Sequence, residues 1–428
     1  MNKVLIIGNG GREHSLGWKV SQSEEVDEVL YAPGNAGTEE GKGRNVHIDC
    51  NEKENFPELL KLIRKENVDL TIIGPEIPLA KGLVDFLKNR GYHKVFGPTQ
   101  SASKLESDKF YSYNLMDKLN IPQANSAKCF TLGDARRAIE EKTSEKGIVI
   151  KARGLTAGKG VSVCSSKEEA LRELILHYKK YGEEVLIAER LFGQEFSVFG
   201  ISDGNMVLPL EISVQDHKRE LDGDRGRNTG GMGAYCPVPI FTNELVKKIA
   251  EEIMTPLVLK MKEEGNEYRG FLYAGMIMSG SGLKIIEFNA RFGDPECQPV
   301  MMMIKSDLYK IISKALAGKL NEVQIDFNPG ASCCVVLSSK DYPGDYEIDL
   351  PISGLENVAN MKNVQVFHAG TKLKGDKILT NGGRVLGVTA YSQENLLSAQ
   401  RLAYEAVSKI NIPGGFHYRG DIAKKALK

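Results

Sequence analysis

The sequence predicts an α/β protein that begins with a Rossmann-like parallel sheet covered by helices. Short β-branched runs alternate with longer amphipathic patterns throughout residues 3–105, as in successive strand–helix–strand units. Three of the strands end in polar or glycine-rich loops, which is where ligands of parallel sheets bind. The expected strands are residues 4–7, 28–31, 70–73 and 94–96, and the expected helices begin at residues 12, 56 and 79.

The rest of the chain is expected to form two further domains. A helix is predicted at residues 109–119, followed by mixed strand and helix signals up to about residue 325. An Asn-Pro-Gly sequence at residues 328–330 marks a boundary, and short strands with turn signals follow it before an amphipathic helix near residues 393–409. The expected domains are therefore residues 1–105, 106–325 and 330–428, the last a small α+β domain.

Composition excludes several classes of protein. Lys plus Arg and Asp plus Glu each number 56, so the zero net charge gives no electrostatic footprint for nucleic acid. No apolar run approaches the roughly 20 residues of a membrane helix, and the N-terminus does not have the pattern of a signal peptide. Seven cysteines without Cys-x-x-Cys spacing argue against disulfides or a zinc site. We expect a cytoplasmic protein with small-molecule partners and no nucleic-acid or membrane partner.

The most informative segment is residues 287–296, which follows an apolar run. If residues 284–289 form a strand, Ile286 and Phe288 enter the core while Glu287 and Asn289 share the other face. Their two side-chain oxygens suit Mg²⁺, which is usually held by one or two protein oxygens together with phosphates and water. The segment therefore favours phosphoryl transfer, although a strand end with solvated polar residues would look the same.

The N-terminal strand ends favour a phosphorylated small molecule. Glycines after a first strand let a phosphate approach a helix N-terminus. A dinucleotide is opposed because Glu13 replaces the third glycine of that fingerprint and because the second strand ends in Ala32 instead of an acid. A tight turn without ligand remains the alternative. The candidate binding residues are Gly8, Asn9, Gly10, Gly11, Arg12 and Glu13, with Gly74, Pro75 and Glu76.

Residues 148–161 predict a hairpin with a basic, glycine-rich tip that could cover the phosphates of a nucleotide. It is not a Walker A loop, because three residues, not four, separate Gly154 from Gly158, and Gly160 stands where Ser or Thr is needed. A solvated tip is the alternative. Residues 185–195 could read an adenine through backbone groups, with Glu195 near the ribose, or could be a buried strand and turn. The glycine-dense loops at 215–219 and 227–234 are too long for simple turns.

Taken in order, these motifs resemble the ATP-grasp superfamily and, within it, the phosphoribosylamine-glycine ligases. The resemblance covers essentially the whole chain. Arg153 stands where the family usually has Asp, and Arg227 where it usually has Pro, so these two residues put the detail of the loops near the triphosphate in question. The segments that carry the resemblance are residues 8–14, 33–37, 74–76, 104–109, 151–161, 215–219, 228–234, 287–296, 368–371 and 383–386.

The resemblance implies an ATP-grasp fold with a mobile lid near residues 125–190. It implies that ATP, glycine and 5-phosphoribosylamine give glycinamide ribonucleotide, ADP and phosphate through glycyl phosphate, in purine biosynthesis. Mg²⁺ or Mn²⁺ would bind Glu287 and Asn289, and the N-terminal loops would bind phosphoribosylamine. Arg291 would pair with the glycine carboxylate, and Asp294 or Asp216 would hold its ammonium. The expected ATP-binding residues are Lys109, Lys151, Gly158, Lys159, Glu189, Leu191 and Glu195.

Three rival functions remain open from the sequence. One is another ATP-grasp ligase with a different acid or amine, one is an NAD-dependent oxidoreductase, and one is a nucleotide sensor without catalysis. A sensor would be expected to lose Glu287, Asn289 or Arg291, and all three are present. We expect a monomer whose lid closes before chemistry, so that Gly158→Pro would reduce turnover far more than stability.

Overall fold

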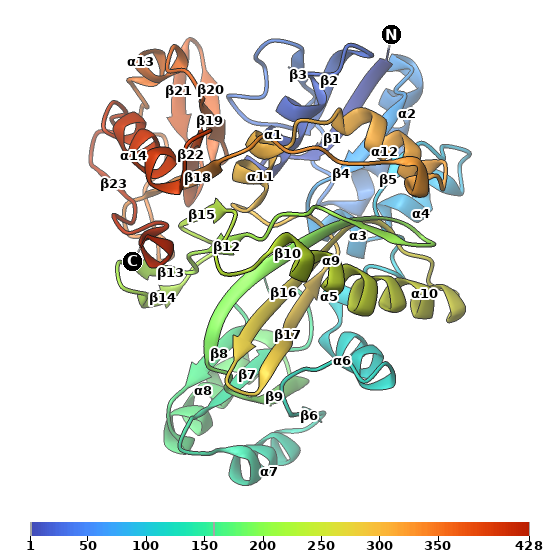
Figure 1. Ribbon diagram of the computed structural model, residues 1–428, viewed down its shortest axis with the longest axis vertical. Helices are drawn as coiled ribbons and strands as arrows, with labels where there is room; N and C mark the ends of the chain where they lie inside the picture. Colours follow the sequence, from blue (N-terminus) through green and yellow to red (C-terminus); the bar gives the residue numbers. More distant parts are fainter. Residues whose placement is uncertain (1, 157–158, 428) are drawn as a thin grey trace.

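A computed structural model describes residues 2–156 and 159–427 (Figure 1). The N-terminal part is a five-stranded parallel sheet in the order β3-β2-β1-β4-β5, which confirms the predicted α/β arrangement. The chain reverses its direction across the sheet between β1 and β4, so their carboxyl ends flank a topological switch point. The strands are β1 (Asn2–Gly8), β2 (Val26–Pro33), β3 (Gly43–Asn45), β4 (Leu70–Ile73) and β5 (Val95–Phe96).

Helices cover both faces of this sheet. The single helix expected from residue 79 is instead two short helices, because the chain turns at Gly82, whose φ of +83° only glycine adopts easily. The short strand β3 was not expected from the sequence. The helices are α1 (Gly11–Val20), α2 (Phe56–Glu66), α3 (Glu76–Ala80) and α4 (Leu83–Lys88).

The central body is a four-stranded antiparallel sheet in the order β11-β10-β16-β17. Its strands are β10 (Gly193–Asp203), β11 (Val207–Pro209), β16 (Arg269–Ser279) and β17 (Gly282–Asn289). The helices associated with it are α5 (Lys104–Ser107), α6 (Lys109–Lys118), α9 (Asn243–Ile249), α10 (Thr255–Glu263) and α12 (Leu308–Leu316). Helix α11 (Cys297–Met303) packs against α1.

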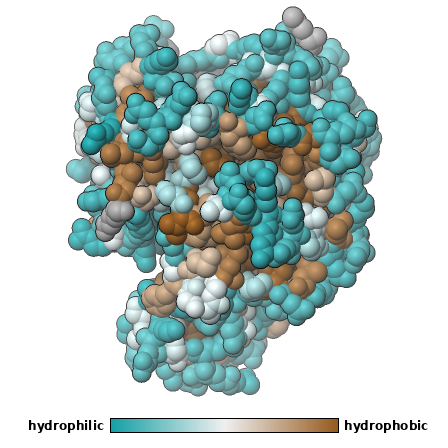
Figure 2. All heavy atoms as spheres, in the orientation of Figure 1, coloured by the Kyte–Doolittle hydropathy of each residue, from teal (hydrophilic) through white to brown (hydrophobic). Residues whose placement is uncertain are grey.

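A separate lobe projects from the body and has its own apolar core (Figures 1 and 2). It is a four-stranded antiparallel sheet in the order β6-β9-β7-β8, and its outer surface is largely hydrophilic. This lobe covers the range in which a mobile lid was expected. Its elements are β6 (Ser126–Cys129), α7 (Leu132–Lys142), β7 (Ile148–Ala152), β8 (Val161–Cys164), α8 (Lys167–Tyr181) and β9 (Val185–Glu189).

The last sheet combines strands from the central and C-terminal parts of the sequence, in the order β12-β15-β18-β22-β19, with β23 paired to β18. Two small hairpins, β13–β14 and β20–β21, flank it. In the described part of the chain, no helix is long and apolar enough to cross a membrane. The elements are β12 (Gln215–Asp216), β13 (Arg219–Leu221), β14 (Arg225–Asn228), β15 (Gly233–Cys236), β18 (Ala331–Ser339), α13 (Leu355–Ala359), β19 (Val364–His368), β20 (Thr371–Lys374), β21 (Lys377–Thr380), β22 (Arg384–Ser392), α14 (Leu396–Val407) and β23 (Phe416–His417).

Candidate active site

Strand β17 delivers the two predicted metal ligands to one end of the central sheet. Glu287 lies opposite Gly275 and Asn289 opposite Tyr273, so both project from the same face of β17. The expectation that Ile286 enters the core is wrong. The register shifts by one residue there, and Ile285 is the fully buried neighbour instead. This bulge leaves Ile286 half-buried, with its carbonyl free to accept a hydrogen bond.

Glu287 is surrounded by cations. Burial alone would raise the pKa of this carboxyl, but Lys218, Lys151 and Lys109 outweigh burial and hold its pKa below the ordinary value. It is therefore ionised at neutral pH, and no side-chain hydrogen bond occupies it in the described part of the chain. The amide of Asn289, a buried residue, supplies a second hard oxygen on the same face. These residues fit one divalent cation completed by phosphate oxygens, and no cluster of three or more His, Cys, Asp or Glu metal ligands occurs among the described residues.

The lysines approach Glu287 from three different elements. Lys151 at the end of β7 is buried, and its Nζ donates to Tyr113 Oη and to the Ile286 carbonyl, both at 3.1 Å. Lys109 begins α6, and its Nζ lies 3.4 Å from the Gly154 carbonyl. Lys218 follows β12, and its Nζ lies 3.4 Å from Glu195 Oε2. The lid and the body thus bring three positive charges to one anionic group.

Arg291 is held by two carboxylates. Its Nη2 lies 2.9 Å from Glu106 Oε1 and its Nε lies 3.4 Å from Glu76 Oε2, while Nη1 donates to the Phe292 carbonyl at 3.1 Å. Burial raises the pKa of Glu106 to about 7 in spite of Arg291, whereas Arg291 and Arg12 together keep the pKa of Glu76 below its ordinary value. Glu106 also accepts from the Ala290 amide at 2.8 Å, so it fixes both the side chain and the backbone at the end of β17.

The two N-terminal loops close around Glu13. Its Oε2 accepts from the Gly10 amide at 2.8 Å, and its Oε1 pairs with Arg12 Nε at 2.5 Å. A Cβ added to Gly74 would lie 2.1 Å from Glu13 Oε1, and a Cβ on Gly8 would lie 2.5 Å from its Cγ. These glycines are therefore required for Glu13 to lie between β1 and β4 at the switch point.

These loops also contact the central body. The Nη1 of Arg12 donates to the Phe292 carbonyl at 3.1 Å, one residue after Arg291. The predicted residues Asn9, Gly11 and Pro75 lie in the same two loops, and the Asn9 carbonyl accepts from Asn35 at 2.8 Å. The candidate phosphoribosylamine site therefore adjoins the candidate glycine site.

The two acids considered for an ammonium differ in their surroundings. Asp294 is occupied, because its Oδ2 pairs with Arg384 Nη2 at 3.2 Å and its Oδ1 accepts from Gln298 at 2.9 Å. Asp216 Oδ1 is buried and has no hydrogen-bond partner among the described residues. Burial, followed by the nearby carboxyl of Glu296, raises the pKa of Asp216, and burial raises the pKa of Glu296 as well. Asp216 and Glu296 thus form a buried carboxyl pair in which one oxygen of Asp216 has no partner among the described residues.

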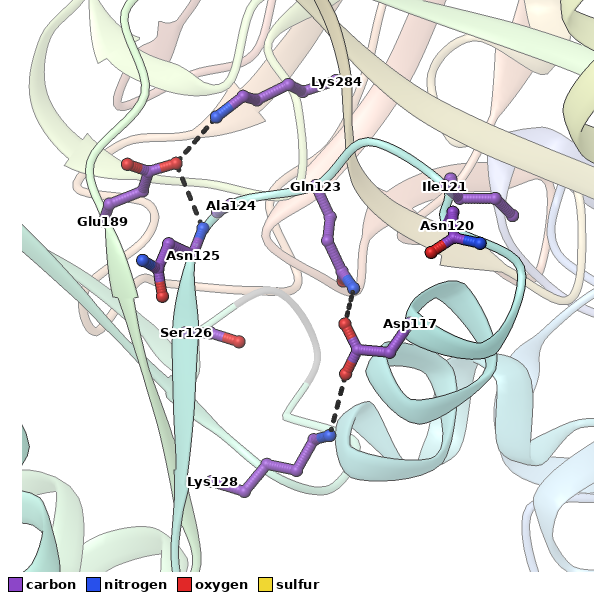
Figure 3. Close-up of a pocket in the computed structure, with 10 residues that line it drawn as sticks. All are labelled: Asp117, Asn120, Ile121, Gln123, Ala124, Asn125, Ser126, Lys128, Glu189 and Lys284. Carbon is purple, nitrogen blue, oxygen red and sulfur yellow. Dashed lines mark hydrogen bonds and ion pairs between the residues drawn. The ribbon is translucent and has the colours of Figure 1, made fainter.

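The expected nucleotide-binding edge runs from Glu189 to Glu195 between the lid and the body. The Glu189 side chain is fixed, because its Oε1 accepts from Lys284 Nζ at 2.8 Å and from the Asn125 amide at 3.1 Å (Figure 3). Both groups line a polar cavity of about 480 Å³ at the entry to the lid. Leu191, farther along this edge, is half-buried. Lys159 is exposed near the hairpin tip, and Gly158, together with the Gly158→Pro test, lies outside the described residues.

The two residues that depart from the family pattern are tied to neighbouring acids. Arg153 Nε donates to Asp108 at 2.9 Å and its Nη1 to Glu184 at 2.9 Å. Arg227 forms a two-pronged contact with Glu220, with both distances 2.9 Å. Each guanidinium is therefore engaged locally.

Two other residues singled out in the sequence have structural surroundings. His217 is buried, and its Nε2 accepts from the Ala423 amide at 3.1 Å. Burial lowers the pKa of His217 to about 3, so the ring is neutral. Burial raises the pKa of the Cys297 thiol, which makes that cysteine unreactive.

Sequence reasoning missed four charged residues of the site as individual candidates: Glu106, Lys218, Glu296 and Arg384. Lys218 and Glu296 lie within segments that the sequence singled out, two residues after the predicted site acids Asp216 and Asp294. Arg384 Nη1 donates to the carbonyls of Gly230 and Asp294, at 2.6 and 2.5 Å. Glu106 and Arg384 lie within residues 104–109 and 383–386, which carry the family resemblance, but no local pattern could have assigned their roles, because their partners lie far away in the sequence.

Known proteins match this chain along nearly its whole length. Residues 2–106, 107–297 and 332–425 match the family models for the N domain, the ATP-grasp (A) domain and the C domain of phosphoribosylglycinamide synthetase. A phosphoribosylamine-glycine ligase from Rhodopirellula baltica is 44% identical over 434 residues, covering 99% of this chain and 98% of the relative. A human trifunctional purine biosynthetic protein is 43% identical and covers 99% of this chain, which spans 42% of that protein.

Solved structures give the same result. The crystal structure of phosphoribosylamine-glycine ligase from Thermotoga maritima has a TM-score of 0.82 and 33% identity, covering 98% of this chain and all of that one, 100%. The biotin carboxylase domain of a Hydrogenobacter thermophilus carboxylase has a TM-score of 0.73 at 17% identity, covering 97% of this chain and 91% of that one, which shows a shared fold alone. The chain belongs to the phosphoribosylglycinamide synthetase family of ATP-dependent ligases.

Proposed function

We propose that this protein joins glycine to 5-phosphoribosylamine with ATP, giving glycinamide ribonucleotide, ADP and phosphate in purine biosynthesis. Family membership along the whole chain supports this reaction. The single observation that carries it is that Lys109, Lys151 and Lys218 surround Glu287, four residues before Arg291. A reaction between a carboxylate and a triphosphate brings anions together, so it needs cations fixed in advance at the meeting point.

In the proposed first step, a glycine carboxylate oxygen attacks the γ-phosphorus and ADP leaves. Lys109, Lys151 and Lys218 would lower the electrostatic barrier by binding triphosphate oxygens as charge moves onto the leaving group. Mg²⁺ or Mn²⁺ held by Glu287 and Asn289 would supply further neutralisation of the phosphates. The protein provides no covalent nucleophile in this scheme.

Glycine would be recognised at its two charged ends. Arg291 would bind the carboxylate through the N–H groups that Glu106 and Glu76 leave free, since these acids fix the plane of its guanidinium. Asp216 would accept the ammonium, because Asp294 is already paired with Arg384 and Gln298. This choice between the two acids rests on which one has a free oxygen.

In the proposed second step, the amine of phosphoribosylamine attacks the acyl carbon of glycyl phosphate and phosphate leaves. The loops around Glu13 and Glu76 would hold the phosphoribosyl group at the switch point. The contacts that Arg12 makes with Phe292 and Glu76 makes with Arg291 support direct transfer, because they join the two substrate sites. A closed lid would exclude water from the acyl phosphate.

The test is phosphate release from Mg-ATP with glycine, with and without phosphoribosylamine made from ribose 5-phosphate and ammonia. The expected result is release that requires both substrates, together with formation of the amide product. Release with a different acid or amine would retain the ligase and overturn the substrate assignment. No release in any combination would favour a nucleotide-binding protein without catalysis.

We also propose a division near residues 105 and 330, a monomer, and a reducing cytoplasmic setting. The ranges matched by the three family models support the division. All seven cysteines are buried and unpaired, which supports a reducing compartment. Sedimentation of the purified protein tests the monomer.

A further inference from the structure

The C-terminal segment of the chain runs along the loop that carries Asp216 and Lys218. Figure 1 shows the C-terminus beside the β13–β14 hairpin, which continues directly from β12. Backbone groups join the two segments at several points. His417 Nε2 bonds to the Glu220 carbonyl at 2.7 Å, the Gly420 amide donates to Asp222 at 2.9 Å, the Gly223 amide donates to Asp421 at 2.8 Å, and the Ala423 amide donates to His217 at 3.1 Å.

Arg419 is at the centre of this contact, and its side chain is 0% exposed. Its Nε and Nη2 donate to the two oxygens of Asp421 at 2.7 and 2.8 Å. Its Nη1 donates to Asp224 at 2.9 Å and to the Arg219 carbonyl at 3.1 Å. A buried guanidinium needs such partners, and here one of them is the backbone immediately after Lys218.

Besides the C-terminal segment, the hairpin is held by its own strand pairing and by Arg227, which donates to the Asp341 carbonyl at 3.3 Å. Leu221 is 41% exposed and residues 225–227 are all exposed, so apolar burial cannot fix this loop. On the other side, Lys218 has its carbonyl bound by the Thr229 amide at 2.8 Å and by the Thr229 hydroxyl at 2.9 Å. The His217 amide donates to the Gly233 carbonyl and its carbonyl accepts from the Met232 amide, both at 2.9 Å, so the chain before Lys218 is fixed by the body. The chain after Lys218 is the hairpin, whose contact with the C-terminal segment is made by polar groups.

We propose that residues 417–425 form a clamp in which Arg419 is a positioning residue for Lys218. The clamp fixes the ammonium group of Lys218 between Glu195 and Glu287, where the triphosphate is expected. The effect on turnover rests on the proposed function, whereas the effect on nucleotide binding can be measured without it. The C-terminal segment thus contributes to the ATP site without touching it.

The test compares Arg419→Gln, Lys218→Ala and the double variant with the unchanged protein. Nucleotide affinity is measured by calorimetry with Mg²⁺ and a non-hydrolysable ATP analogue, and turnover by glycine-dependent phosphate release. Arg269→Gln is the matched control, because Arg269 also pairs with an acid, Glu267, and with a carbonyl, but lies at the start of β16. Asp421→Asn serves if Arg419→Gln does not fold, because it weakens the same clamp while leaving Asp224 in place.

We expect Arg419→Gln to weaken nucleotide binding and to lower kcat about tenfold or more, with the KM for phosphoribosylamine changed less than about twofold. In the Lys218→Ala background, removing Arg419 should cost less than about twofold further, because both changes remove the same interaction. Equal losses in both backgrounds, or losses no larger than those of Arg269→Gln at equal stability, would overturn the clamp. Coupled losses in nucleotide affinity without any ligation of glycine would support the clamp and overturn the proposed function.

Discussion

Replacing Arg291 with Gln tests the centre of the site, because it removes one cation from between two buried acids. Glu106 and Glu76 would then face each other across the end of β17 without the guanidinium that now separates them. Two consequences follow from the same contact. The protein should lose stability at alkaline pH, and glycine should lose the partner of its carboxylate.

The size of the stability loss follows from the geometry. Arg291 lies 2.9 Å from Glu106 and 3.4 Å from Glu76, and at an effective dielectric constant of about 20 each attraction is about 5 kcal/mol before desolvation. Breaking a buried pair by removing one partner costs about 3–5 kcal/mol in practice. We expect a loss in this range at pH 8.

The loss should shrink in acid. The pKa of Glu106 is about 7 in the folded protein, above its ordinary value, so ionisation of this carboxyl opposes folding as the pH rises through that pKa. Without Arg291 the pKa of Glu106 rises further. Protonation at pH 6 then removes most of the unpaired charge, and we expect the loss to be smaller by at least about 1.4 kcal/mol than at pH 8.

Urea unfolding followed by the fluorescence of Trp18 measures this directly, since Trp18 packs edge-on against Phe367 with ring centroids 5.6 Å apart. In parallel, the KM for glycine should rise by about a hundredfold while that for ATP changes little. The double variant Arg291→Gln, Glu106→Gln should recover stability but not glycine affinity. An unchanged KM for glycine would refute the substrate role of Arg291, and a loss that is the same at pH 6 and pH 8 would refute the electrostatic argument.

Three further predictions concern separate parts of the molecule. Glu287→Gln should lower kcat by about 10²–10³ and raise the Mg²⁺ concentration needed for half-maximal phosphate release, and unchanged Mg²⁺ dependence would contradict its role. Gly74→Ala should raise the KM for phosphoribosylamine about tenfold, because its Cβ would lie 2.1 Å from Glu13 Oε1, and steady-state kinetics measure this. Burial lowers the pKa of His14 from 6.5 to about 3, so in acid the unfolded chain takes up a proton that the folded protein does not. The free energy of unfolding should therefore fall as the pH drops below 6.5, by about 2 kcal/mol at pH 5. In urea unfolding, the difference in the free energy of unfolding between pH 7 and pH 5 should be smaller for His14→Asn than for the unchanged protein.

The parallel sheet could be predicted because its signals are local. Continuous β-branched runs and the helical patterns between them located β1, β2, β4 and β5. The strand β3 was missed because it has only three residues, Gly43–Asn45, and no apolar pattern. The strand order of the C-terminal sheet could not be predicted from the sequence. Strand β15 pairs with β18, which lies almost a hundred residues later, and neither strand has a pattern that points to its partner.

The candidate site divides in the same way. The sequence could predict Glu287, Asn289 and Arg291. Their residue types and their spacing at a strand end together indicate a metal and anion site. The bulge at Ile286 could not, since it depends on how β17 pairs with β16. The role of Glu106 could not be predicted either, because its pairing with Arg291 arises only when α5 packs against the end of β17.

Local and non-local residues have different tasks in this site. The residues that the sequence indicates are those proposed to touch substrates, and they lie on strand ends and glycine-rich loops. Lys218 is an exception, because the sequence did not indicate it individually and it is proposed to touch the triphosphate. Other residues that the sequence did not indicate hold the first set in place: Glu106 holds Arg291, Arg384 holds Asp294, and Arg419 holds the loop of Lys218. A charge that must be fixed to within a fraction of an ångström needs a partner from a second element, because its own strand or loop sets only its direction. Substitutions in the supporting set should therefore disturb individual substrate constants selectively, according to which reacting group each one holds.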